Sequence, residues 1–427
     1  MYDFTSRVNR EGTGAAKYIA MKNINPDVPE GIVPLSVADM EFKMAPEIIR
    51  GLTTYLEDLV LGYTVPGDAW LDSIRGWMRT RHGWETEREW IIPAEGVIGA
   101  FFNAVQAFTG PGDGVIIMTP VYPPFYMAVE RNRRRVIRNE LKVENGRYGI
   151  DFVDLEKKAQ VPENKLLILC NPHNPVGRVW ERRELEQISA ICIKNNVIVV
   201  SDEIHFDFIM KGYKHTVFTS LGGEAAENSL VLSAPSKTFN LAGLHASYAV
   251  IPNPEIRKRY HDTFLTHSPH PGLNSLAYRA TEIAYTECET WLDELLSVLD
   301  SNKRFVERFM AERIPAIKVF PLEGTYLQWW DCRDLDLRKI PKAAPDSRLS
   351  YAGGPKGYTD SRELERFMTH EAFLFLDEGY IFGEGGKGYE RINLACPRSV
   401  LQESLERLEK ALHKRNLIYP AAKQSRC

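Results

Sequence analysis

Short apolar runs separated by amphipathic stretches repeat along residues 45–275. The runs lie at 90–96, 113–120, 165–172, 196–203, 229–236 and 247–252. They are almost continuously apolar, as in strands that are buried on both faces of a mostly parallel sheet. The stretches between them, such as IGAFFNAVQAF and ERRELEQISAICIKNN, have the periodicity of helices. This alternation predicts a doubly wound α/β architecture.

The pattern changes after about residue 285. Long helical stretches alternate there with strand-like TYLQWWDC and ERINLAC. We expect a large α/β domain over residues 45–288 and a smaller α+β domain formed by 1–44 together with 289–427. The chain of 427 residues, 44% of them hydrophobic, is longer than a single core usually organises, which also favours two domains. Residues 338–360, rich in Pro, Gly and Lys, are expected to form an extended loop.

Charge and cysteine usage argue against several function classes. Lys and Arg total 53 against 57 Asp and Glu, so there is no basic excess to attract nucleic acid or a membrane surface. The basic run RNRRR at 131–135 has no interleaved aromatic residues and is interpreted as a solvated helix end. The six cysteines are scattered, the start of the chain is polar, and no apolar stretch approaches the ~20 residues of a membrane span. We expect a soluble cytoplasmic protein, and we expect no metal because the histidines of HSPH lack companion ligands.

Unusual residues follow several of the predicted strands, at the edge of an open sheet where ligands collect. WIIPAEG runs into GVIGAFFNAVQAF, which places a glycine and free backbone N–H groups at the start of a helix. Such a helix start can bind a phosphate, or it can be an ordinary strand-to-helix turn. In MTPVYPPF, Tyr122 is placed to lie on a planar ligand or to pack in the core. In LCNPHNPVG, Asn174 follows an irregular turn and can offer its amide to a ligand, although such turns are also purely structural.

Two further strand ends carry charged residues. VIVVSDEIH places Asp202 and Glu203 at the end of a strongly apolar strand, with His205 just beyond. Burying an acid is costly unless a positive group pairs with it. The alternative is that the aspartate caps a helix. SAPSK brings Lys237 to the end of its own strand among hydroxyl groups, whereas a single lysine is usually a solvated surface group. Five such motifs in chain order favour one shared ligand site.

These motifs resemble those of the fold-type I pyridoxal-phosphate enzymes of the aminotransferase class I/II superfamily. The finer resemblance is to the MalY/PatB branch, the cystathionine β-lyase-like C–S lyases, because DEIH replaces the tyrosine-bearing version of most aminotransferases. The fold that this resemblance implies is a large domain with a mostly parallel seven-stranded sheet flanked by helices, plus a smaller α+β domain. The matching segments are VADMEF (37–42), TPVYPPF (119–125), NPHNPVG (171–177), SDEIHFDF (201–208), APSKTFNLAGL (234–244) and RINLACPRS (391–399).

The resemblance implies a role for each of these positions in binding pyridoxal 5′-phosphate. Lys237 is expected to form the Schiff base and Asp202 to pair with the pyridinium nitrogen. The other expected contacts are ring stacking by Tyr122, bonds to the 3′-oxygen region by Asn174 and His205, and phosphate binding by the amides of Val97 and Ile98 with the hydroxyl of Ser233 or Ser236.

The resemblance also implies how substrate and a second subunit take part. Arg391 is expected to grip the substrate α-carboxylate as a planar two-pronged donor, with Asn174 and Ala38 nearby. Tyr63 of GYTVPG is expected to reach the phosphate of a neighbouring subunit, which implies a homodimer. Three positions depart from the pattern of many relatives, Ser36 in place of Trp, His245 in place of a phosphate-binding arginine, and the long 338–360 loop. They bear on substrate size rather than on the chemistry.

The function implied is a carbon–sulfur β-lyase that cleaves cystathionine or cysteine S-conjugates to a thiol, pyruvate and ammonia through a Lys237 Schiff base. A small amino acid is the expected substrate. The alternative is an aminotransferase of the same superfamily. A third hypothesis is a MalY-like regulator that acts through a protein partner, which ranks last because the catalytic set is complete.

Overall fold

The computed structural model describes residues 2–267, 272–340 and 362–419. At its centre lies a seven-stranded sheet of order β1-β9-β8-β7-β6-β2-β3, in which the five strands from β8 to β3 are parallel and β9 runs antiparallel to both β1 and β8. This confirms the predicted fold class. The strands are β1 (Ile91–Glu95), β2 (Gly114–Thr119), β3 (Arg135–Glu140), β6 (Asn164–Cys170), β7 (Ile198–Asp202), β8 (Ser229–Ser233) and β9 (Ala246–Val250).

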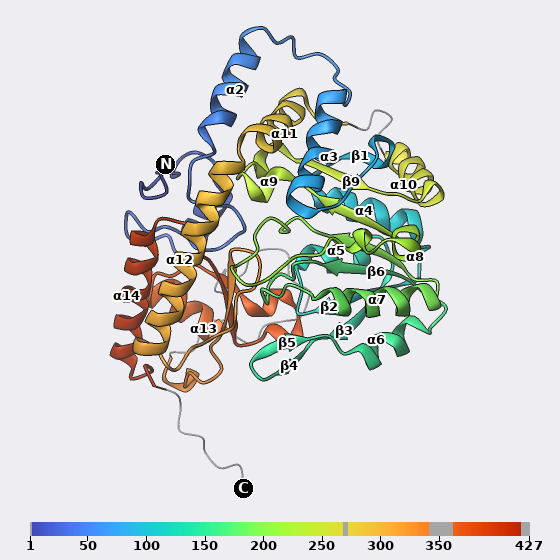
Figure 1. Cartoon of the computed structure of the whole chain (residues 1–427). Coiled ribbons are helices and arrows are strands. Elements are labelled where there is room, and N and C mark those ends of the chain that lie inside the picture. Colours follow the sequence, from blue (N-terminus) through green and yellow to red (C-terminus); the bar gives the residue numbers. More distant parts are fainter. Residues whose placement is uncertain (1, 268–271, 341–361, 420–427) are drawn as a thin grey trace.

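Helices cover both faces of this sheet (Figure 1). Alternate residues of β2 explain why the strand is apolar throughout, because Val115 and Ile117 pack into one core cluster and Ile116 and Met118 into another. The first cluster includes side chains of α4 (Gly96–Phe108), α5 (Pro123–Arg131) and α10 (Pro254–His267), and the second those of α6 (Phe152–Ala159) and α7 (Arg182–Lys194).

The basic run at 131–135 is only partly a helix end. Helix α5 ends at Arg131, Arg133 adopts a left-handed backbone conformation with φ 60°, and Arg135 opens edge strand β3. The interpretation of the run as a solvated helix end was therefore wrong for its last residue. Because β3 lies at the sheet edge, its arginines reach solvent while the backbone still pairs with β2.

A second, antiparallel sheet of order β10-β11-β13-β12 lies in the C-terminal part of the chain. The N-terminal segment joins it, since Leu35 donates to the carbonyl of Phe375 and accepts from the amide of Asn393. The predicted domain division at residue 288 stays a prediction, although α12 begins at Glu289. The elements here are α1 (Ala16–Ile24), α12 (Glu289–Arg313), β10 (Lys318–Val319), β11 (Leu327–Asp331), α13 (Arg362–Arg366), β12 (Asp377–Glu378), β13 (Tyr389–Asn393) and α14 (Arg398–Arg415).

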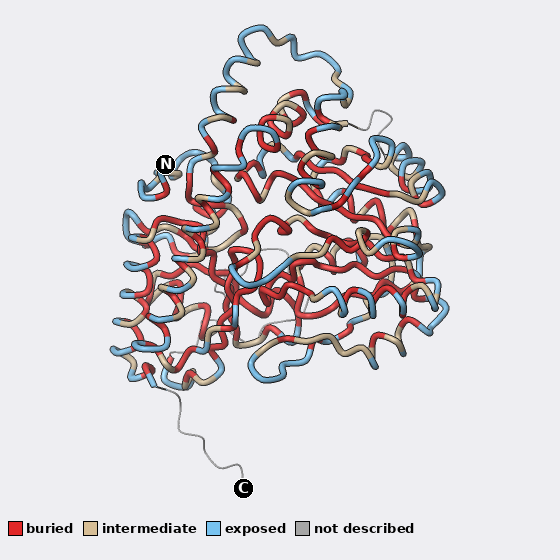
Figure 2. Tube along the Cα trace, in the orientation of Figure 1, coloured by how far each residue is buried: buried red, intermediate tan, exposed pale blue. Residues whose placement is uncertain are grey.

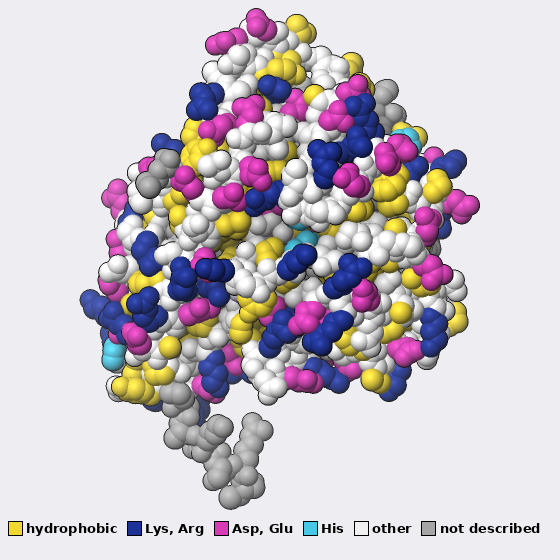
Figure 3. Space-filling model, viewed as in Figure 1, with side chains coloured by type: hydrophobic (Ala, Val, Ile, Leu, Met, Phe, Trp, Pro, Cys, Tyr) yellow, Lys and Arg dark blue, Asp and Glu magenta, His cyan; other side chains and the backbone are white. Residues whose placement is uncertain are grey.

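The remaining elements connect these parts. The buried core is continuous through both sheets, whereas the chain between α2 and α3 projects as an exposed loop (Figure 2). Charged side chains of both signs are interspersed over the face shown in Figure 3. Most of the predicted 338–360 loop lies outside the described residues. The other helices and strands are α2 (Pro46–Glu57), α3 (Asp68–His82), β4 (Lys142–Glu144), β5 (Arg147–Gly149), α8 (Gly223–Glu227), α9 (Pro235–Thr238) and α11 (Ser275–Glu287).

Within the described parts of the chain, every helix is too short or too polar to cross a membrane.

Candidate active site

A cavity of about 410 Å³ opens at the carboxyl ends of the central strands. Its wall combines the start of α4, the turns after β2, β6 and β7, helix α9 and the segment around Ala38. Parallel strands bring their carboxyl ends to one edge, so motifs that are far apart in the sequence meet there. The cavity gathers these expected site residues: Ala38, Val97, Ile98, Tyr122, Asn174, Asp202, His205, Ser236 and Lys237.

The start of α4 forms a cradle of backbone amides. Gly96 has φ 77°, and its N–H donates to the carbonyl of His245 at 2.7 Å, which turns the chain sharply from β1 into the helix. The amides of Val97 and Ile98 follow at the cavity wall, and the side chain of Glu95 does not cap them. The first N–H groups of a helix lack intrahelical acceptors and carry partial positive charge, so this cradle suits an anion such as a phosphate.

Lys237 lies on the short helix α9 and is half-buried. Its Nζ donates to the backbone carbonyl of Ala38 at 2.7 Å. Desolvation in the cavity lowers the pKa of the amine to about 8, against the opposing attraction of the Asp39 carboxylate. A primary amine with this pKa retains an appreciable uncharged fraction near neutral pH and can act as nucleophile or base.

Asp202, the last residue of β7, and His205 just beyond it are buried with unused hydrogen-bonding capacity. Asp202 accepts the amide of Ile204 at 3.2 Å, and burial raises its pKa to about 7. Burial holds the pKa of His205 well below its usual value, and its Nδ1 has no hydrogen-bond partner among the described residues. A buried carboxyl and an unpaired imidazole on one wall fit a heterocycle that brings a cationic ring nitrogen and a polar substituent.

Glu203, the other acid of this motif, points away from the cavity. It accepts hydrogen bonds from Ser201 Oγ at 2.7 Å, from the amide of Phe218 at 2.8 Å and from His215 Nε2 at 2.8 Å. Its carboxylate is therefore occupied in holding the chain after β7. The adjacent acids thus have different environments, and Asp202 is the one available to a ligand.

Arg391 on β13 connects the second sheet to the cavity wall. Its Nη1 donates to Asn174 Oδ1 at 2.7 Å and its Nη2 pairs with Asp377 at 2.5 Å. The side chain is buried, and its Nε has no hydrogen-bond partner within the described residues. The guanidinium is therefore held in one orientation with donor capacity to spare, which suits a carboxylate ligand.

The two candidate serines occupy different places. Ser236 lies on α9 and lines the cavity. Ser233 ends β8 beneath it, fully buried, and its Oγ donates to the Glu203 carbonyl at 3.4 Å. Of these two serines, the described wall of the cavity therefore includes only Ser236.

Tyr63 lies on the projecting loop between α2 and α3. Its side chain is fully exposed, and it is not among the described residues that line the cavity of its own chain. His245 does line the cavity, in a left-handed conformation with φ 55°, beside the phosphate cradle.

Some residues around the cavity carry no signal in the sequence. Tyr326, whose hydroxyl donates to the Ala38 carbonyl at 2.9 Å, appears in TYLQWWDC as one more apolar strand residue. Cys170 accepts the Asn174 amide through Sγ at 3.4 Å and belongs to the end of an apolar strand. The positions of Asp39 and Glu41 within VADMEF did indicate a functional segment, although not the partners of these acids.

Known proteins match this chain over almost its whole length. Cystathionine beta-lyase PatB of Bacillus subtilis is 38% identical, with 96% of this chain and 100% of PatB covered. Protein MalY of Escherichia coli is 29% identical, with 96% and 99% covered. Cystalysin from Treponema denticola, whose crystal structure contains a pyridoxal 5′-phosphate cofactor, is 47% identical with a TM-score of 0.90, covering 97% and 99%.

The model of the family described as aminotransferase class I and II matches residues 67–408, which include every strand of the large sheet and of the second sheet. The motifs that suggested the family, its fold and its branch are therefore confirmed. The chain belongs to the aminotransferase class I and II family, and within it to the MalY/PatB branch.

Proposed function

We propose that this protein is a pyridoxal-phosphate-dependent β-lyase that cleaves the Cβ–S bond of cystathionine or of cysteine S-conjugates, with Lys237 as its catalytic residue. The observation that carries the proposal is the meeting of Lys237, Asp202 and the amide cradle of α4 in one cavity. The expected enzyme class is confirmed by PatB, named a cystathionine beta-lyase, and the expected cofactor by cystalysin.

The residues of the cavity fit this cofactor. The amides of Val97 and Ile98 with the Ser236 hydroxyl would hold the phosphate, and Tyr122 would stack on the ring. Asp202 would stand at the ring nitrogen. The 3′-oxygen would lie beside Asn174 and His205, and Lys237 would anchor the cofactor covalently.

Within this arrangement each charged group has a defined task. When bound, the cofactor supplies an electron sink for the Cα–H electrons, which then leave with sulfur as the Cβ–S bond breaks. Ionised Asp202 would keep the ring nitrogen protonated, because a positive ring would offset the burial that otherwise raises the pKa of this carboxyl. Nζ of Lys237 takes the proton from Cα, and the fragment that remains yields pyruvate and ammonia with water.

Arg391 positions the substrate. Its guanidinium, oriented by Asp377 and Asn174, offers a fixed fork to the α-carboxylate. Ala38 lines the cavity, and its carbonyl lies at Nζ of Lys237. Substrate bound by its carboxylate would therefore present Cα to the amine.

We also propose that the active form is a homodimer in which the partner's Tyr63 reaches the cofactor phosphate. The projecting loop exposes Val60, Leu61, Tyr63 and Val65, with between 74% and 105% of each residue accessible. An apolar loop of this kind is costly in water and is typical of an interface. The proposed dimer would act on a small substrate in the cytoplasm.

The experiment that tests the function is an assay with L-cystathionine. A β-lyase releases pyruvate without any added keto acid, whereas an aminotransferase requires a keto-acid acceptor. Lys237→Ala protein provides the blank. Turnover that depends strictly on the keto acid contradicts the lyase assignment and supports the aminotransferase alternative.

A further inference from the structure

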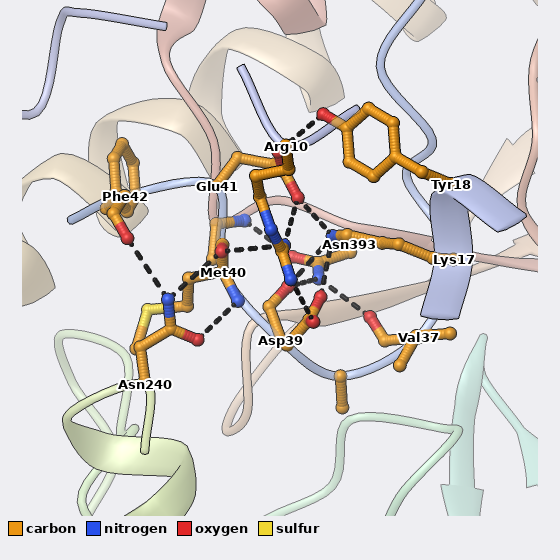
Figure 4. Close-up of polar contacts among 12 residues, drawn as sticks. Arg10, Lys17, Tyr18, Val37, Asp39, Met40, Glu41, Phe42, Asn240 and Asn393 are labelled. Carbon is orange, nitrogen blue, oxygen red and sulfur yellow. Dashed lines mark hydrogen bonds and ion pairs between the residues drawn. The ribbon is translucent and has the colours of Figure 1, made fainter. Parts of the chain in front are cut away.

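Residues 37–42, which we call the strap, include Ala38 of the cavity wall and are fixed at the backbone by hydrogen bonds (Figure 4). Asn240 accepts the Met40 amide at 2.9 Å and donates to the carbonyls of Met40 and Phe42 at 3.1 Å. Asn393 donates to the carbonyls of Val37 and Asp39 at 2.8 and 2.7 Å. Two amide side chains from distant parts of the chain therefore set the path of the strap.

One side of the strap carries a compact ion cluster. Lys17 of α1, whose side chain is 0% exposed, lies 2.8 Å from Asp39 Oδ1 and 2.7 Å from Glu41 Oε1. Arg10 pairs with the same two carboxylates at 2.8 and 2.6 Å, and the Tyr18 hydroxyl donates to Glu41 at 2.8 Å (Figure 4). A fully buried lysine is expensive to desolvate, so these pairs are needed to hold it.

The other side of the strap meets the catalytic lysine. The carbonyl of Ala38, next in sequence to Asp39, accepts from Lys237 Nζ at 2.7 Å and from the Tyr326 hydroxyl at 2.9 Å. The backbone of one residue thus separates the ion cluster from the amine. A displacement of Asp39 must move the acceptor of the Lys237 hydrogen bond.

The cluster also acts on Lys237 through its charge. Burial raises the pKa of Asp39, but the charges and hydrogen bonds of Lys17 and Arg10 lower it by more, so the net pKa lies below its usual value. This carboxyl is therefore ionised near the Lys237 amine. The charge of Asp39 favours the ammonium form of Lys237, and that of Lys17 opposes it. The other titratable or charged groups around Lys237 in the described chain are Glu95, Tyr122, Cys170, Asp202, His205, His245, Tyr326 and Arg391.

We propose that Lys17 is a positioning residue for Lys237. By pairing with Asp39 it holds the Ala38 carbonyl against Nζ and offsets the carboxylate charge that would otherwise keep the amine protonated. This inference rests on the proposed function in one respect only, namely that Lys237 is the lysine that carries the cofactor.

The test is competitive labelling of the ε-amine of Lys237 in the full-length protein freed of cofactor. An amine-reactive reagent in trace amount is applied across pH 6 to 10, and peptide mapping gives the apparent pKa of this one amine. The variants are Lys17→Met and Asp39→Asn. Glu41→Gln is the matched control, because it removes a carboxylate from the same cluster. Glu41 is not among the charges that act most on Lys237, which are those of Asp39, Arg391, Asp202 and Lys17.

The expected result is a pair of opposite shifts. Lys17→Met raises the apparent pKa of Lys237 by about half a unit to one unit, Asp39→Asn lowers it by a similar amount, and Glu41→Gln changes it less than either. Loosening of the strap alone would move the first two variants in the same direction. Shifts of the same sign, or none beyond that of Glu41→Gln, overturn the proposal.

A second variant covers the case in which Lys17→Met does not fold because Arg10 alone is left to balance the carboxylates of Asp39 and Glu41. Lys17→Met combined with Glu41→Gln removes one charge of each sign and keeps the Arg10–Asp39 pair. It is expected to show the upward shift as well, and a downward shift contradicts the proposal.

Borohydride reduction of cofactor-loaded protein and peptide mapping separate this inference from the proposed function. Cofactor found on another lysine would refute the role of Lys237 in catalysis, while the labelling would still decide whether Lys17 acts on the Lys237 amine.

Discussion

Arg391 on β13 and Asn174 after β6 are joined by a hydrogen bond of 2.7 Å that links the two sheets at the active site. Asn174 is expected at the cofactor and Arg391 at the substrate carboxylate. The bond therefore fixes the distance between the two ligands. A change at Arg391 should alter substrate binding first, because the expected cofactor contacts within the chain come from residues 97–237.

Arg391→Lys should raise the KM for L-cystathionine about 10- to 100-fold with a smaller effect on kcat, because lysine cannot form the two-pronged contact. Steady-state pyruvate release measures both constants. Arg333→Lys is the matched control, since Arg333 pairs with Asp331 at the same sheet and its side chain is 58% exposed. Equal effects of the two substitutions would contradict the assigned role of Arg391.

Asp202 should make the cofactor-free protein less stable as the pH rises. Its pKa in the folded protein, about 7, lies above the ordinary 3.8, so the folded state binds the proton more tightly than the unfolded state. Stability from this group is present below about pH 4 and is lost as the pH rises to about 7, by at most ~4 kcal/mol. Asp202→Asn should remove this dependence.

Urea unfolding of cofactor-free wild type and Asp202→Asn at pH 5 and pH 7.5 measures the difference. Other buried acids, such as Glu365, contribute equally to both proteins and cancel in the comparison. With cofactor bound, the wild type should lose this part of the dependence, since the ring cation keeps the carboxylate ionised. An unchanged pH dependence in Asp202→Asn would refute the prediction.

Ser236→Ala should weaken retention of the cofactor about 3- to 10-fold by removing one neutral hydrogen bond to the phosphate. Ser233→Ala is the control, because Ser233 donates to the Glu203 carbonyl beneath the cavity. It should reduce stability by about 1 kcal/mol and leave cofactor affinity near that of wild type. Equilibrium dialysis of each variant against pyridoxal phosphate provides the measurement, and the reverse order of affinities would assign the phosphate to Ser233.

The protein should sediment at twice its monomer mass of 48.7 kDa, and Leu61→Glu should shift it toward the monomer. A charge placed in the apolar loop must be desolvated on association. Val153→Glu, at an exposed apolar position on α6, is the control and should remain dimeric. Tyr63→Phe should keep the dimer and lose cofactor affinity, and a Tyr63→Phe protein with unaltered affinity would exclude the contact with the partner's phosphate.

Much of the large sheet could be predicted because its central strands are apolar on both faces, which marks β2, β6, β7 and β8 in the sequence. Strand β3 was missed, since an edge strand exposes its side chains and its arginines conceal the pattern. The antiparallel direction of β9 was not predicted either. A buried strand has the same apolar composition in either direction, so only the connections decide it.

In the candidate site, too, some features follow from sequence patterns and others depend on the three-dimensional packing. Motifs at strand ends indicated Lys237, Asp202 and Asn174, because a shared sheet edge brings them together. The position of Ser236 on the cavity wall, with Ser233 beneath it, depends on how the backbone turns into α9, which composition does not reveal. The pairing of Lys17 with Asp39 joins residues 22 positions apart through tertiary packing, and no local periodicity reports such a contact.

The attachment of the strap also has a consequence for biosynthesis. Residues 37–42 leave the ribosome early, yet Asn393, which fixes their carbonyls, is made some 350 positions later. The large sheet can form while the strap still lacks this anchor. The strap has both of its amide anchors, Asn240 and Asn393, only once β13 has been translated. A chain interrupted before β13 therefore lacks both Arg391 and Asn393, and so lacks the guanidinium next to Asn174 as well as one anchor of the strap.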